Sequence, residues 1–141
     1  MSIIDISNKH DVINLKISNE IIKCIKDVTN ITDEEKKNIT DILNTNKCDY
    51  DAINNLRKYI KTSYYQQING NKYDRSLLLL ADNLVKGQGD GRISDSDMKK
   101  LVDSAWDNNT ITDVEKSTLF YISENYNSTN KAIDYLTGYF N

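Results

Sequence analysis

Several residue types that mark catalytic, metal-binding or membrane proteins are scarce in this chain of 141 residues. Its two cysteines, Cys24 and Cys48, form no CxxC pair, so neither a disulfide framework nor a cysteine metal cluster is expected. Its single histidine, His10, has no serine or cysteine in a triad-like context. No apolar run approaches the roughly 20 residues of a membrane span. We therefore predict a non-enzymatic, intracellular protein of the cytoplasm that has no membrane segment and no resident cofactor.

Proline is absent, whereas isoleucine and asparagine each occur 18 times and lysine occurs 15 times. Codons for these residues are rich in A and T, so the composition is typical of A/T-rich genomes, such as those of some giant viruses, protists and bacteria. A viral source would make the virion a second expected location. The formal net charge of −3 argues against a protein that coats nucleic acid through bulk charge.

The most informative feature that is present is an internal repeat. Residues 31–60 align without a gap on residues 111–140, and ten of these thirty positions are identical. Each copy begins with a T-x-x-E capping box, a pattern that predicts a helix start, at Thr32 to Glu35 and at Thr112 to Glu115. The repeat therefore predicts two copies of one helical module.

The last helix of each copy repeats an apolar stripe that we expect to face a core. Its members are Ala52, Ile53, Leu56, Tyr59 and Ile60 in the first copy and Ala132, Ile133, Leu136, Tyr139 and Phe140 in the second. Further upstream we align Ile17-Ser18 with Ile93-Ser94, which shortens the spacing by four residues and makes Ser18 a helix cap. The patterns predict helices over residues 18–28, 32–45, 49–61, 74–86, 94–107, 112–125 and 129–140.

These elements predict an all-α fold of about seven helices, in which two related three-helix modules and a connecting helix pack as one helical domain. The first repeat covers residues 1–62, the linker and connecting helix cover residues 63–92, and the second repeat covers residues 93–141. The sequence Asn69-Gly70-Asn71 predicts a turn, which we interpret as the hinge between the repeats.

The loop between the connecting helix and the second repeat carries the sharpest local motif, Gly87-Gln88-Gly89-Asp90-Gly91-Arg92-Ile93-Ser94-Asp95-Ser96-Asp97. Over about 12 residues it resembles the calcium loop of EF-hand proteins, in particular the dockerin variant that closes with aspartate. The resemblance implies metal-ligating roles for Asp90, Ser94 and Asp97, at the fifth, ninth and twelfth loop positions. The first and third positions hold Lys86 and Gln88 in place of carboxylates, so a metal-free EF-hand-like module is the expectation and calcium binding the alternative.

A second candidate is a basic segment in an otherwise acidic chain. Five cations lie among tyrosines between residues 56 and 75: Arg57, Lys58, Lys61, Lys72 and Arg75. Cations neutralise phosphates and aromatic faces stack on bases, so this segment is the candidate contact for nucleic acid or another anionic partner. The competing interpretation is a solvated helix face.

With so little catalytic equipment, we expect a non-catalytic structural or protein-interaction module that binds a protein partner or self-associates. A calcium-binding EF-hand-like module and a nucleic-acid-binding accessory protein are the two alternatives. Exposed polar faces and five tyrosines are further candidate contacts, with a place in the core as the alternative for the tyrosines: Tyr64, Tyr65, Tyr121, Tyr126 and Tyr135.

Overall fold

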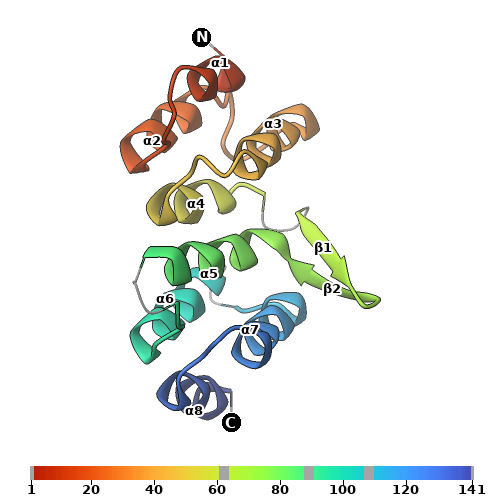
Figure 1. Ribbon diagram of the computed structural model, residues 1–141. Helices are drawn as coiled ribbons and strands as arrows, with labels where there is room; N and C mark the ends of the chain where they lie inside the picture. Colours follow the sequence, from red (N-terminus) through yellow and green to blue (C-terminus); the bar gives the residue numbers. More distant parts are fainter. Residues whose placement is uncertain (1, 61–63, 88–90, 107–109, 141) are drawn as a thin grey trace. The chain divides into compact units, whose positions relative to one another are not determined.

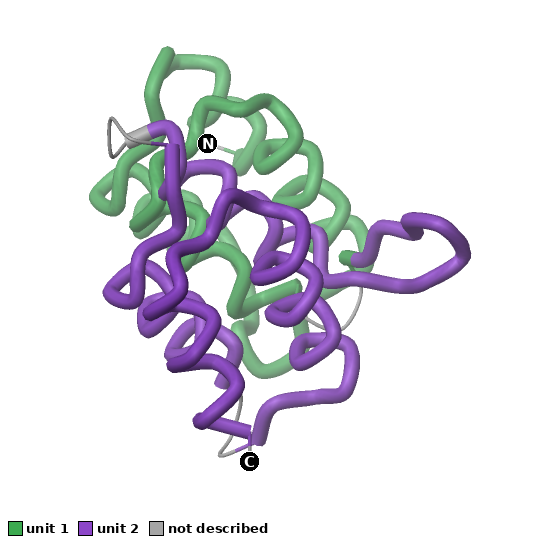
Figure 2. The backbone as a smooth tube through the Cα atoms, turned by 60° about the horizontal axis from the view of Figure 1, so that its bottom comes forward, with its two compact units in different colours: residues 1–64 green, residues 65–141 purple. Residues whose placement is uncertain are grey.

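The structure is a computed structural model that describes residues 2–60, 64–87, 91–106 and 110–140. Eight helices and one two-stranded hairpin lie in these ranges, so the predicted all-α class is confirmed, with one helix more than expected (Figure 1). The chain divides into two compact units, residues 1–64 and residues 65–141 (Figure 2). In the described part of the chain, none of the helices has the length and apolar character needed to cross a membrane.

Unit 1 contains four helices: α1 (Ile3–Asn8), α2 (Leu15–Lys23), α3 (Asp33–Asn44) and α4 (Tyr50–Arg57). Helix α1 packs on both α2 and α3, and α2 packs on α4. The starts of α1 and α3 are fixed by capping boxes, and those of α2 and α4 by the side chains of Asn14 and Asp49. The apolar faces meet in a core of isoleucines and leucines, of which Ile13, Ile21, Ile39 and Leu56 are fully buried.

Unit 2 begins with a hairpin, β1 (Tyr65–Ile68) and β2 (Asn71–Asp74), and continues with α5 (Arg75–Gly87), α6 (Asp95–Ala105), α7 (Asp113–Asn125) and α8 (Asn130–Tyr139). Helix α5 packs on α6 and α7, and α6 packs on α8, which repeats the pairing seen in unit 1. The predicted connecting helix α5 thus belongs to unit 2, where it takes the place that α1 has in unit 1.

A short backbone bridge in each unit shows that the repeat is longer than the sequence alignment suggested. The amide of Ile13 donates to the carbonyl of Lys47 at 2.9 Å, and the amide of Ile93 donates to that of Asn127 at 2.9 Å. The bridges pair Ile13 with Cys48 and Ile93 with Ser128, so equivalent residues keep the spacing found downstream. The four-residue change of register that we inferred from Ile17-Ser18 is therefore wrong.

The same bridge corrects the start of the second helix. Helix α2 begins after Asn14, whose side chain accepts from the amide of Ile17 at 3.0 Å, in the position that Ser94 has before α6. Ser18 lies inside α2, is buried, and donates its hydroxyl to the carbonyl of Leu15 at 2.7 Å. A serine flanked by isoleucines resembles a cap with a hydrophobic staple, but here it back-bonds within the helix.

Two elements escaped the sequence prediction. Helix α1 has only six residues, too few to show a helical period, although Ser2 and Asp5 form a capping box at its start. The predicted turn at Asn69 and Gly70 joins β1 to β2 with positive φ at both residues, 53° and 83°, as a two-residue hairpin turn requires. That turn is the tip of a hairpin within unit 2, so the interpretation as a hinge is corrected.

Candidate interaction surface

Two of the three predicted metal ligands are used to start a helix. The hydroxyl of Ser94 accepts from the amide of Asp97 at 3.1 Å, and the Asp97 carboxylate accepts from the amide of Ser94 at 3.1 Å. This reciprocal pair is the capping box of α6, and Asp97 is buried within it. Asp90, the third predicted ligand, lies outside the described residues. Within the described ranges there is no group of three or more histidine, cysteine, aspartate or glutamate side chains arranged to hold a metal ion.

The predicted basic segment is divided between the two units. Lys58 follows α4 in unit 1 and is exposed, whereas Lys72 and Arg75 lie on the hairpin and at the start of α5 in unit 2. The Lys72 ammonium lies 4.1 Å from the centroid of the Tyr65 ring, and Arg75 donates to the Gln66 side chain at 3.0 Å. Lys61 lies outside the described residues.

Arg57 does not belong to that surface. Its side chain is fully buried, on the same face of α4 as the buried Ile53. Arginine can bury its apolar stem where its head group has partners, which charge counting along a sequence does not reveal. The prediction that Arg57 contacts an anionic partner is corrected on this ground.

Unit 2 carries a cluster of partly exposed rings that joins the end of α6 to α7 and α8. We call it the aromatic cluster, and its members are Trp106, Phe120, Tyr135, Tyr139 and Phe140. The Trp106 indole donates to the Tyr139 hydroxyl at 2.6 Å. Ring centroids lie 5.1 Å apart for Tyr139 and Phe140, 5.8 Å for Phe120 and Phe140, and 6.0 Å for Tyr135 and Tyr139. These separations are those of interacting aromatic pairs, so the rings hold one another in place.

Lysines border this cluster. Lys99 of α6 places its ammonium 5.5 Å from the centroid of Tyr135, and Lys116 of α7 places its ammonium 5.2 Å from that of Phe140. Both distances are within the range of cation–π attraction. An apolar centre with a charged edge is the usual composition of a protein interface.

Trp106 and part of the apolar stripe of α8 are exposed, whereas most of the equivalent stripe of α4 in unit 1 is buried. Trp106 is 42% exposed, Tyr139 is 39% and Ile133 of α8 is 37%. Ile53 and Ile60, the counterparts of Ile133 and Phe140, are only 4% and 1% exposed. The predicted core stripe of α8 is therefore correct for Ala132 and Leu136 and wrong for Ile133 and Tyr139, because sequence periodicity marks an apolar face without showing whether anything covers it.

Unit 1 has a pocket at the place that corresponds to the aromatic cluster. A pocket of about 420 Å³ is lined there by Val28, Thr29, Asn30, Ile31, Lys36, Lys58 and Tyr59. We call it the lysine pocket. Tyr59 and Lys36 are the counterparts of Tyr139 and Lys116, but Lys26 stands in place of Trp106. The two units thus differ at the corner where the second helix, the third helix and the end of the fourth come together.

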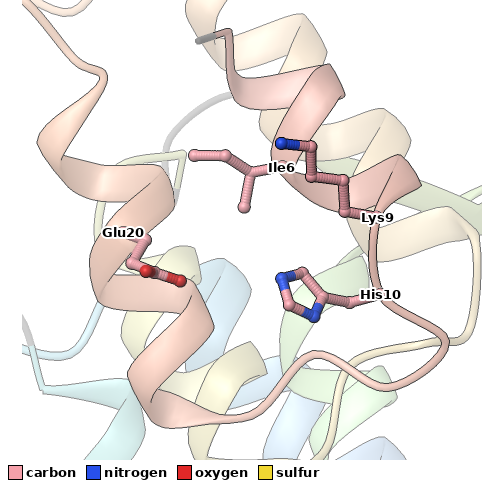
Figure 3. A pocket seen from close by; sticks show the side chains of 4 residues that line it. All are labelled: Ile6, Lys9, His10 and Glu20. Atoms are coloured by element: carbon pink, nitrogen blue, oxygen red, sulfur yellow. The ribbon is translucent and has the colours of Figure 1, made fainter.

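A second pocket of unit 1, of about 240 Å³, lies between the end of α1 and α2 (Figure 3). Figure 3 shows the His10 imidazole and the Glu20 carboxylate facing each other across it, with Ile6 and Lys9 on the α1 side. Its described lining includes the acidic Glu20 and the basic Lys9. The two charges are opposite, so the pocket has no strong preference for the charge of a ligand.

Comparison with protein-family models, with curated proteins and with solved structures finds no match to this chain. A function must therefore be argued from the side chains themselves. Sequence reasoning named Tyr135 as a candidate contact but assigned Tyr139 and Phe140 to a core. The sequence signal at this place is Trp106, which aligns with Lys26 at the spacing of the repeat and so has no aromatic counterpart in the first copy.

Proposed function

We propose that this protein is a non-catalytic protein-interaction module that binds a protein partner through the aromatic cluster of unit 2. The observation that carries the proposal is the joint exposure of Trp106 and Tyr139, two residue types that dominate binding energy at protein interfaces. Isolated exposed apolar residues are ordinary on a protein surface, but a contiguous set held by mutual contacts favours an interaction site.

The cluster is also ordered before any partner binds. The hydrogen bond from Trp106 to Tyr139 and the ring contacts with Phe140 restrict side chains that would otherwise lose rotamer freedom on binding. Lys99 and Lys116 at its edge supply charges that orient an approaching partner. An aromatic centre whose edge carries lysines, together with Asp103 near Tyr135, favours a partner surface that combines apolar and charged residues.

Affinity capture from the source cells tests the proposal, with and without calcium. Trp106→Ala should lose the partner that the wild-type chain retains, since removing an interface tryptophan costs about 2 kcal/mol, or about 30-fold in Kd. Leu15→Ala in unit 1 is the matched control, because Leu15 is a 47% exposed apolar residue outside the cluster. Retention of the same partner by Trp106→Ala, or its equal loss by Leu15→Ala, would refute the proposed surface.

A further inference from the structure

The lysine pocket of unit 1 has a different chemistry from the aromatic cluster. Lys36 of α3 and Lys58 after α4 both line it, and none of its described lining residues is acidic. This is unusual in a chain whose formal net charge is −3. Two lysines that line one depression favour an anionic ligand, because an ammonium group donates charge-assisted hydrogen bonds to a phosphate or carboxylate.

Two of the lining residues, Thr29 and Asn30, belong to a turn that is held by hydrogen bonds. The Asp27 carboxylate accepts from the Thr29 amide at 3.0 Å and from the Thr29 hydroxyl at 2.7 Å. The amide of Asn30 donates to the Asp27 carbonyl at 3.1 Å. The Asp27 carboxylate is thus engaged with the turn, and the Glu35 carboxylate, next to Lys36 in sequence, accepts from the Thr32 amide at 3.0 Å. Neither acid is among the described lining residues.

The size and the lining of the pocket also bear on the ligand. The pocket is an open depression of about 420 Å³, which a small molecule can occupy. Its lining is mostly polar, and the Tyr59 ring and the side chains of Val28 and Ile31 supply the smaller, apolar part beside the cations. A ligand that uses both features carries an anionic group and a flat or apolar group.

We propose that the lysine pocket binds a small phosphate ester, with Lys36 and Lys58 contacting the phosphate and Tyr59 packing against the organic group. This site is independent of the aromatic cluster and of the partner proposed for it. Lys58, a residue of the predicted basic segment, lines this pocket together with Lys36.

Titrations of the full chain followed by amide NMR test this inference with three probes: adenosine monophosphate, adenosine and inorganic phosphate. Adenosine monophosphate should shift the amides of residues 28–31 saturably, with a Kd in the millimolar range or below. Inorganic phosphate should shift the same amides more weakly, and adenosine should not. Equal shifts with phosphate alone would show that the organic group adds nothing, and equal shifts with adenosine would remove the role of the lysines.

Charge variants separate the pocket from general attraction. Lys36→Gln and Lys58→Gln should each weaken binding of adenosine monophosphate by about three- to tenfold, and added salt should weaken it further. Lys37→Gln is the matched control, because Lys37 neighbours Lys36, pairs with Asp41 at 3.5 Å and is not among the lining residues. A loss of equal size in Lys37→Gln, or no saturable shift with the wild-type chain below about 10 mM, would overturn the proposal.

Discussion

The role of Asp97 differs between two interpretations of the loop that precedes α6, so a variant of this residue can distinguish them. In the EF-hand resemblance it is the closing metal ligand, and its removal should matter only when calcium is present. In the structure its carboxylate accepts the Ser94 amide and completes a capping box, so its removal should destabilise unit 2 whether or not calcium is present. Stability measurements on one variant therefore test both interpretations.

The size of the effect follows from the contacts. Asp97→Ala removes one charge-assisted hydrogen bond at 3.1 Å and one acidic group from the first turn of α6. Asp97 is only 4% exposed, so water replaces the lost contact poorly. These contributions amount to about 1–2 kcal/mol. Asp97→Asn keeps an acceptor and loses only the charge, so it should cost about 0.3–1 kcal/mol.

Thermal unfolding followed by circular dichroism measures these differences. A loss of about 1 kcal/mol lowers the Tm by about 4–8 °C if unit 2 unfolds alone, and by about half as much if the chain unfolds as one. Ser94→Ala should cost about 1 kcal/mol, and the double variant should cost less than the sum because the two residues share one capping box. The reasoning fails if Asp97→Ala leaves the Tm unchanged without calcium and abolishes a rise in Tm that calcium gives the wild type.

Two further predictions concern ionisable groups of unit 1. Burial, with a smaller contribution from the charge of Asp49, raises the pKa of the Cys48 thiol to about 12. In the variant Cys24→Ser, where Cys48 is the one remaining cysteine, a thiol reagent at neutral pH should therefore react only after denaturation. Rapid modification of the native variant would contradict this. The hydrogen bond from the Thr32 amide lowers the pKa of Glu35 below its usual 4.5, so its contribution to stability is present above that pH and is lost as the pH falls through the lowered value. Glu35→Gln should flatten the decline in Tm between about pH 5 and pH 3, and an unchanged decline would argue against this assignment.

Local signals in the sequence were sufficient for most of the helices. The capping boxes predict the starts of α3 and α7 to within one residue. The helix predicted over residues 74–86 begins at Arg75, where the carboxylate of Asp74 accepts from the Leu77 amide at 3.2 Å. Each of these signals involves residues within one helical turn. Such contacts form in the same way whatever the rest of the chain does.

Long-range contacts account for the errors. The bridge between Ile13 and Cys48 joins residues distant in sequence, and it places Ser18 inside α2 rather than at its start. Arg57 was expected at a surface because charged residues are seldom fully buried, yet it lies in the core. Neither result follows from the composition or periodicity of one segment.

The corner that differs between the units is also where a duplicated module can diverge at least cost. Core positions such as Ile42 and Ile122 are identical and at most 1% exposed, and a change there would leave a cavity or force repacking. Tyr59 and Lys36 of this corner are identical to their counterparts Tyr139 and Lys116. Unit 1, however, has Lys26 where unit 2 has Trp106, and it has a pocket where unit 2 has the aromatic cluster. Trp106 and its counterpart Lys26 are both exposed, so this change requires no repacking of the interior, and under the two proposals made above the units present chemically distinct surfaces.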